Sequence, residues 1–214
     1  MNSKPELILV RHGEVEPVWK SICYGAMDVQ LSEVGVRSSL VFADLITRCF
    51  RPAWVVHSGL MRTRLLAQAI AEACTEPSMV CEDVRLRERH YGQWQGRSWD
   101  EAYASDPENF HGLIEHPDSY RPPEGETTSE MQTRIVAWYR ECFLTKPLRQ
   151  QPVVVVAHSG PIAALAGHLL QLHARDWQPW TLKPLQAIAV SNLCPGVSPR
   201  CEVLDLLSVN GNAQ

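Results

Sequence analysis

Three short apolar runs, each followed at once by a cationic or nucleophilic side chain, constrain the fold of this chain most strongly. They span residues 7–10, 53–57 and 153–157, and the third, Val-Val-Val-Val-Ala, is the purest β-branched run in the sequence. Such runs are typical of buried strands. Helical patterns follow the second and third runs, and this alternation predicts an α/β fold with a parallel sheet.

The residues that follow these runs indicate phosphate chemistry. Arg11 and His12 follow the first run, Arg62 follows the second after a short turn, and His158 follows the third. Ligands of open α/β sheets bind beyond the carboxyl ends of the strands, where the ends of neighbouring strands meet. Arginine binds a phosphate through paired charge-assisted hydrogen bonds, and a neutral imidazole can attack phosphorus. We therefore expect one shared phosphate site, although a lone Arg-His pair is more often an ion-paired surface element.

Small and polar residues indicate where the two later helices begin. Ser58 and Ser159 have the side chains of helix N-caps, and Pro161 suits a first helical turn. A phosphate at such a helix start would meet exposed backbone amides as well as Arg62. Gly13, directly after His12, lets the backbone approach a ligand closely.

A phosphate ester also needs a catalytic acid, because an alkoxide is a poor leaving group until it receives a proton. We expect Glu88 to supply that proton. It lies in a segment, 86–97, whose two glycines and Trp94 indicate a fixed loop beneath an aromatic ring. A bound phosphate dianion would favour the protonated carboxyl by like-charge repulsion. The alternative is a salt bridge from Glu88 to Arg87 or Arg89.

Hydrophobic periodicity predicts a mixed α/β chain. Strands are expected at 6–11, 53–57, 79–84 and 153–157, closing strands at 185–190 and 201–207, and helices at 33–49, 60–74, 127–144 and 161–171. Thr127 and Glu130 fit a capping box at the start of the third helix. With 214 residues, the chain is long enough to bury a substantial core as a single domain, 1–214.

Residues 105–126 interrupt this periodicity. Four prolines exclude one long element there, and a long irregular stretch is commonly functional. We expect this segment to form a cap over the site. The side chains expected to select the substrate are His111, His116, Tyr120 and Arg121.

Composition excludes several kinds of partner. A net charge of −4 and a pI near 6.1 give no basic field for nucleic acid, so affinity for phosphate must be local to a pocket. The N-terminus has no apolar signal-peptide core, and no stretch approaches the roughly 18 apolar residues of a membrane helix. We expect a cytoplasmic protein that binds neither nucleic acid nor membrane, and the sequence leaves its oligomeric state open, a homodimer included.

Cysteine and histidine spacing gives no sign of a metal site. The seven cysteines contain no Cys-x-x-Cys pair, and we expect them to be reduced thiols that mostly pack in the core. His168 and His173 have no carboxylate or cysteine at ligand spacing. We expect neither a metal ion nor a cofactor.

In combination, these motifs resemble the histidine phosphatase superfamily, the group related to phosphoglycerate mutase, from about residue 7 to residue 170. Residues 11–14 resemble the family's opening motif, and Tyr24-Gly25 with Asp28 and Leu31-Ser32-x-x-Gly35 resembles the segment after it. The other matching motifs are Ser58 to Arg62, Leu86-x-Glu88 with Gly92-x-Trp94-x-Gly96, and Ala157-His158.

The resemblance implies a three-layer α/β/α fold with a mixed, mainly parallel central sheet and a cap insertion. It makes His12 the phosphorylated nucleophile and Glu88 the acid and base, while Arg11, Arg62 and a protonated His158 neutralise the phosphate. One nitrogen of His12 must donate to an acceptor that fixes the tautomer, either a backbone carbonyl of the loop or Glu14. Residues expected to contact the substrate are Tyr24, Gly25, Ser58, Arg89, Tyr91 and Ser159.

Three functions fit the sequence: a phosphomonoesterase of a small phosphorylated metabolite, a phosphoglycerate mutase-type enzyme, and a non-catalytic phosphate-binding protein. Arg89 and Tyr91 could hold the substrate carboxylate of a mutase. However, Trp99 stands where mutases usually carry lysine, and Arg121 alone stands where they show paired arginines. The chain is therefore short of the cations that would retain a doubly charged intermediate, and hydrolysis is favoured. The presence of both His12 and Glu88 argues against a non-catalytic protein.

Among the phosphatases, Cys23-Tyr24-Gly25 and Arg97-x-Trp99-Asp100 look most like the α-ribazole phosphatases. Four positions depart from the family pattern. They are Val18 for asparagine, Gln95 for glutamate, Ser159 for glycine, and Ala163 for an arginine frequent in α-ribazole phosphatases. Loss of the asparagine amide removes a phosphate donor, for which the Ser159 hydroxyl can compensate.

Overall fold

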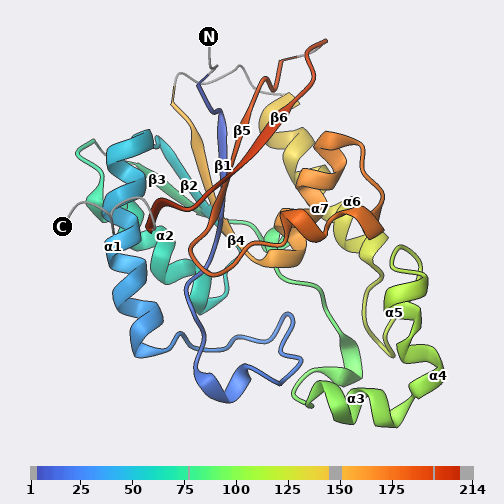
Figure 1. The fold of residues 1–214 in the computed structure, drawn as a ribbon. Helices are drawn as coiled ribbons and strands as arrows, with labels where there is room; N and C mark the ends of the chain where they lie inside the picture. Colours follow the sequence, from blue (N-terminus) through green and yellow to red (C-terminus); the bar gives the residue numbers. More distant parts are fainter. Residues whose placement is uncertain (1–3, 77, 145–150, 195, 208–214) are drawn as a thin grey trace.

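A computed structural model describes residues 4–76, 78–144, 151–194 and 196–207, which contain a six-stranded sheet (Figure 1). Its order is β3-β2-β4-β1-β5-β6. The strands are β1 (Leu7–Arg11), β2 (Trp54–His57), β3 (Met79–Glu82), β4 (Val153–Ala157), β5 (Ala187–Ser191) and β6 (Arg200–Leu204). The first four are mutually parallel, and β5 runs antiparallel to both β1 and β6. The predicted mixed, mainly parallel sheet is therefore confirmed.

Strand register brings the chemistry-bearing residues to one edge of the sheet. Arg11 pairs with Ala157, so His12 and His158 continue two neighbouring strands side by side. His57 pairs with Val156 on the other side of β4. The turn after β2 therefore begins at the same edge, as the parallel arrangement requires.

Helices cover both faces of the sheet (Figure 1). On one face, α1 (Glu33–Phe50) and α2 (Met61–Ala73) pack on Ile8 and Val10, and on the other, α6 (Thr128–Tyr139) and α7 (Ser159–Leu170) pack on Leu7 and Leu9. Alternate residues of β1 thus enter different cores because successive side chains of a strand point to opposite faces. The three-layer architecture is confirmed.

Two helix starts differ from the prediction. Helix α2 begins at Met61 with Leu60 at the N-cap, and α7 begins at Ser159 with His158 at the N-cap. Neither serine is the cap. Thr127, in contrast, forms the predicted capping box with Glu130 at the start of α6.

Two short helices, α4 (Pro107–Phe110) and α5 (Gly112–Glu115), lie in the segment 105–126 that was predicted to be irregular, and a third, α3 (Trp99–Ser105), leads into it. Figure 1 shows them to one side of the main sheet. Ser98 caps α3 through a capping box with Glu101, and Pro107 occupies the first position of α4, where its missing N–H costs nothing. These helices are too short to show a clear hydrophobic period, so periodicity does not predict them.

The remaining helical elements are single turns, apart from a π-helical continuation of α6. They are η1 (Pro17–Trp19), η2 (Val84–Leu86), η3 (Gly92–Trp94), η4 (Arg140–Leu144, the π-helical one), η5 (Ala174–Asp176) and η6 (Gln178–Trp180). None of the helices in the described ranges has the length and apolar character needed to span a bilayer.

Candidate active site

His12 lies at the carboxyl end of β1 and is almost fully buried, with 2% of its surface exposed. Its Nδ1 donates a hydrogen bond of 2.7 Å to the carbonyl oxygen of Gly13, because a carbonyl can only accept. The lone pair of Nε2 is then available for attack. Of the two acceptors that the sequence allowed, the structure selects the backbone carbonyl rather than Glu14.

The surroundings of His12 favour its neutral form. Burial lowers the pKa of the imidazole well below its ordinary value, and the nearby guanidinium groups of Arg62 and Arg11 lower it further. The His158 ring lies edge-on to it, with ring centroids 5.1 Å apart. A neutral imidazole is what nucleophilic attack requires.

Arg62 enters the site from the first turn of α2 and is 1% exposed. Its Nη1 and Nη2 donate to the carbonyl oxygens of Met27 and Gly25 at 2.6 and 2.8 Å, and its Nε donates to Nδ1 of His158 at 3.3 Å. Its guanidinium also lies 5.3 Å from the centroid of the Tyr24 ring. These contacts hold a cation beside His12 in a fixed orientation.

His158 is neutral, which corrects the expectation of a protonated second histidine. Arg62 Nε donates to Nδ1, so that nitrogen cannot carry a proton, and the Nε2 proton points to Ser58 Oγ at 2.8 Å. Burial and the charge of Arg62 lower the pKa of His158 well below its ordinary value. Ser58 is fully buried and hydrogen-bonded to His158, which fits a positioning role, and its predicted contact with the substrate remains a prediction.

Arg11 has one guanidinium nitrogen bonded and one buried without a partner. Nη1 donates to the carbonyl of Leu182, while Nε has no hydrogen-bond partner within the described residues. An unpaired buried donor is costly, and an anion bound beside His12 would satisfy it. The role of Arg11 as a phosphate ligand remains a prediction.

Two backbone amides hold the Glu88 carboxylate. The N–H groups of Arg89 and Gly160 donate to its two oxygens at 2.9 and 3.3 Å. A Cβ atom at position 160 would lie only 2.4 Å from Oε1, so glycine is what allows α7 to approach the acid so closely. Glu88 forms no salt bridge within 4.0 Å to Arg87 or Arg89, the alternative that the sequence left open, among the residues the structure describes.

Arg89 was predicted to contact the substrate, and the structure shows it buried, with each of its three guanidinium nitrogens hydrogen-bonded to the protein. Its nitrogens donate to the carbonyls of Tyr120 and Glu126 and to the hydroxyl of Thr128. It therefore joins the acid loop to the segment 105–126 and to the start of α6. Tyr91 packs against this guanidinium, and burial raises the pKa of its phenol, which stays protonated and able to donate.

The turn at Tyr24 and Gly25 is held to the acid loop by Gln95. Its Oε1 accepts hydrogen bonds from the backbone N–H groups of Ala26 and Tyr91 at 3.0 and 3.3 Å. The glutamine that departs from the family pattern thus has a structural role. Val18, which stands where the family pattern has asparagine, is 67% exposed.

Packing against α1 explains the glycine at position 13, whereas the role predicted for Ser159 stays open. A Cβ atom on Gly13 would meet Ser39 and the backbone of Gly35 at less than 3 Å, so this glycine is required by packing against α1 rather than by a ligand. Ser159 is half-buried in the first turn of α7, next to His158. Its predicted contact with substrate remains a prediction.

The sequence from residue 7 to residue 195 matches the family model for the histidine phosphatase superfamily, branch 1. The chain belongs to this superfamily. A metal-independent phosphoserine phosphatase of Arabidopsis thaliana is 29% identical over 194 residues, which cover 83% of this chain and 79% of the relative. A glucosyl-3-phosphoglycerate phosphatase of Mycolicibacterium vanbaalenii is 31% identical over 177 residues, or 80% and 76% of the two chains.

Solved structures of histidine phosphatases share the fold. A mycobacterial glucosyl-3-phosphoglycerate phosphatase superposes with a TM-score of 0.81 at 27% identity, over 93% of this chain and 97% of the other. The α-ribazole phosphatase of Shigella flexneri has a TM-score of 0.76 at 20% identity, over 92% and 95%, and this likeness shows the fold alone. Relatives at 27% identity also include phosphoglycerate mutases.

The cap side chains expected to select the substrate are engaged elsewhere in this histidine phosphatase. Tyr120 stacks on Trp94 with ring centroids 5.9 Å apart, His111 lies 5.7 Å from the Tyr103 ring, and Arg121 is ion-paired with Glu130. His116 is exposed at the end of α5. None of these four lines the pocket beside Glu88 among the described residues.

That pocket, of about 280 Å³, lies between the acid loop, α6, α7 and the segment 174–181. Hydrophobic periodicity does not predict a role for this segment, because its two helices are single turns. The topology of the sheet, however, does indicate that this segment lies near the site. Because β5 is antiparallel to β1, the residues just before β5 must return to the edge where β1 ends, and Arg11 N–H indeed donates to the carbonyl of Gln186.

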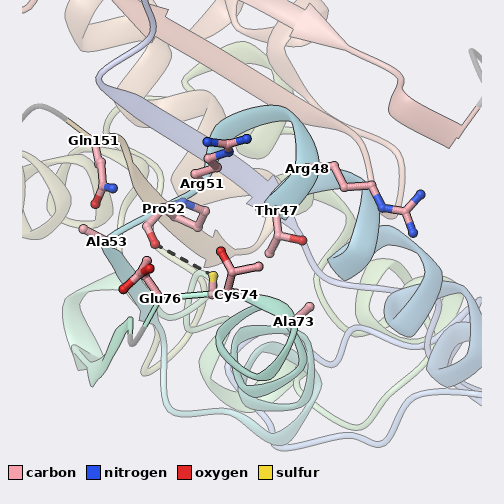
Figure 2. Close-up of a pocket in the computed structure, with 10 residues that line it drawn as sticks. Thr47, Arg48, Arg51, Pro52, Ala53, Ala73, Cys74, Glu76 and Gln151 are labelled. Carbon is pink, nitrogen blue, oxygen red and sulfur yellow. Dashed lines mark hydrogen bonds between the residues drawn. The ribbon is translucent and has the colours of Figure 1, made fainter.

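A larger hollow, of about 450 Å³, lies at the opposite end of the sheet (Figure 2). Its lining comes from the ends of α1 and α2 and from the residues that precede β2 and β4. Arg48 and Arg51 lie at the C-terminus of α1, where the helix dipole favours cations without any ligand. None of the predicted catalytic residues lines this hollow.

Proposed function

We propose that this chain is a phosphomonoesterase that hydrolyses a small phosphorylated metabolite through a phosphohistidine on His12. The observation that carries the proposal is the hydrogen bond from His12 Nδ1 to the Gly13 carbonyl, which leaves Nε2 as a nucleophile beside two guanidinium groups. Relatives named phosphoserine phosphatase and glucosyl-3-phosphoglycerate phosphatase support hydrolysis of a phosphate monoester.

In the first step, Nε2 of His12 attacks phosphorus in line and the ester P–O bond breaks. Arg11 and Arg62 neutralise the equatorial oxygens, whose charge is the main barrier to phosphoryl transfer. Glu88, entering as the carboxylic acid, gives its proton to the leaving oxygen, so the product is a neutral alcohol.

In the second step, the Glu88 carboxylate takes a proton from water as the water oxygen attacks the phosphohistidine. The P–N bond breaks, inorganic phosphate forms, and His12 recovers its lone pair. Glu88 is again protonated, which returns the site to its starting state. His158 stays neutral throughout and orients Arg62 by accepting from its Nε.

Hydrolysis is preferred to mutase-type phosphoryl transfer because the additional cations are already engaged. Arg89 is bonded to the cap, and Arg121 donates to Gly125 and Glu130. Trp99, at the position of the mutase lysine, packs against Tyr91. Few cations are left to hold a bisphosphorylated intermediate while it reorients.

The experiment that tests this mechanism is detection of a phosphorylated His12. His12→Ala is expected to lower hydrolysis of p-nitrophenyl phosphate by about 1000-fold or more and to abolish acid-labile labelling by a radioactive phosphate ester. His168→Ala, on α7 and away from the site, is the matched control and should retain both. Undiminished turnover in His12→Ala would refute the mechanism, and a wild-type protein that binds phosphate without turnover would favour a binding protein.

We further propose that the reaction needs no metal ion and takes place in the cytoplasm. A chelator is expected to leave the rate unchanged, since nucleophile, charge neutralisation and acid all come from side chains. Loss of activity on chelation, restored by one divalent metal, would contradict the metal-independent mechanism.

A further inference from the structure

The pocket of about 280 Å³ adjoins the proposed catalytic acid, Glu88. Glu88 and Gly160, which are hydrogen-bonded to each other, both belong to its lining, and so does Thr181. The next residue, Leu182, accepts the hydrogen bond from Arg11. A phosphate ester held by Arg11 and presented to Glu88 would therefore direct its organic part into this pocket.

Two guanidinium groups line the pocket, and they differ in availability. Arg89 is 6% exposed and is engaged by Tyr120, Glu126 and Thr128. Arg175, on η5, is exposed, and its guanidinium makes no hydrogen bond or ion pair within the described part of the chain. A new anion can thus be bound by Arg175 without breaking an existing contact.

The other residues that line the pocket indicate which chemical group fits between Glu88 and Arg175. Met131, Ala163 and Trp177 form apolar walls, suited to a short carbon chain. The volume of about 280 Å³ lies below the range of roughly 300–1,000 Å³ typical of sites for drug-sized ligands. The pocket is therefore scaled to a small organic group rather than to a drug-sized ligand.

We propose that this pocket is the subsite for the organic part of the substrate and that Arg175 binds a carboxylate there. The substrate class is then small phosphate monoesters of hydroxy acids or hydroxyamino acids. The inference rests on the proposed phosphomonoesterase activity and adds its specificity. A carboxylate is favoured over a second phosphate because one uncommitted guanidinium balances a single negative charge and matches a carboxylate in bidentate geometry.

The experiment compares pairs of substrates that differ in the carboxylate. The pairs are O-phosphoserine with O-phosphoethanolamine, and 3-phosphoglycerate with glycerol 3-phosphate. The wild type is expected to prefer the carboxylate member of at least one pair in kcat/KM. Arg175→Gln should reduce that preference by about 10- to 100-fold, the usual value of a hydrogen-bonded ion pair in a binding site. Arg48→Gln, an exposed arginine at the far end of the sheet, is the matched control and should keep the wild-type preference.

Two results would overturn the assignment of Arg175. One is a wild type that hydrolyses p-nitrophenyl phosphate but prefers the carboxylate member of neither pair, and the other is an Arg175→Gln protein with an unchanged preference. Failure of the wild type to hydrolyse p-nitrophenyl phosphate would instead refute the proposed phosphomonoesterase activity. Thermal melting of both variants identifies any loss that comes from unfolding.

Discussion

Arg62 donates from its Nε to Nδ1 of His158 over 3.3 Å, so the cation of the site fixes the tautomer of its second imidazole. The proton of His158 then lies on Nε2 and is donated to Ser58 Oγ. Ser58 can in turn donate to Thr63 Oγ1, which donates to the carbonyl of Leu60. Each group in this chain therefore donates to the next, from Arg62 to the carbonyl of Leu60. Ser58, Thr63 and His158 are all fully buried.

Thr63→Val should impair catalysis although Thr63 is remote from the phosphate. Valine keeps the shape but leaves the Ser58 hydroxyl without its acceptor, so the His158 tautomer and the orientation of Arg62 are less well fixed. We expect kcat to fall about 10-fold with a smaller change in KM. Thr63→Ser should restore kcat, and ¹⁵N spectra should show a mixed His158 tautomer only in Thr63→Val. Thr47→Val, another buried threonine, serves as control, and wild-type kcat in Thr63→Val would disprove the positioning role.

Glu88→Gln should distinguish leaving groups. Amide cannot protonate an alkoxide, whereas nitrophenolate leaves without a proton, so hydrolysis of glycerol 2-phosphate should fall about 100-fold or more and that of p-nitrophenyl phosphate far less. Steady-state kcat/KM for the two esters is the measurement. Glu124→Gln, an exposed carboxylate elsewhere in the chain, should change neither. Equal losses for both esters in Glu88→Gln would remove Glu88 from the role of acid.

Arg89→Met should destabilise the cap. The substitution leaves the carbonyls of Tyr120 and Glu126 and the hydroxyl of Thr128 without a donor, and we expect a loss of about 3 kcal/mol in the free energy of unfolding. Urea denaturation measures the loss, and amide exchange should accelerate in α3 to α5. Arg121→Met removes a half-exposed ion pair and should cost less than about 1 kcal/mol. Equal stability of the two variants would contradict the structural role of Arg89.

As the pH is lowered, the protein should begin to lose stability at a higher pH than the protonation of its carboxylates alone would cause. The pKa values of buried His12 and His158 lie well below 6.5, so below pH 6.5 the unfolded chain binds more protons than the folded chain. The free energy of unfolding therefore falls as pH falls, by up to about 1.4 kcal/mol per pH unit for each histidine. His57 and His168 act in the same direction. Urea titrations between pH 7.5 and 5 test this, and His12→Asn should reduce the slope. A flat profile would contradict buried neutral histidines.

The sequence was sufficient for features with a strong local signal. The β-branched run before His158 and the apolar run before Arg11 predicted two strands, which the structure places side by side with His12 and His158 together. The predicted capping box between Thr127 and Glu130 is also confirmed. Each of these depends on neighbouring residues alone.

Features that depend on distant partners were not predicted. The side chain of Ser58 has the chemistry of a helix cap, but a tertiary hydrogen bond to His158 uses it instead. Arg89 has the charge to bind substrate, but its guanidinium donates to Tyr120, Glu126 and Thr128, which lie more than 30 residues farther along the chain. Arg175 lies in a segment without periodicity and reaches the site only because β5 reverses direction beside β1.

Glu88 and Arg89 are adjacent, so the backbone N–H that holds the proposed acid belongs to the residue whose side chain is bonded to Tyr120 and Thr128. Loss of those side-chain contacts would therefore also loosen the carboxyl group of Glu88. Activated esters would still phosphorylate His12, but the water that cleaves phosphohistidine would lack its base. A loosened cap would therefore trap the covalent intermediate, and the enzyme would stall half-way through its cycle rather than lose its first step.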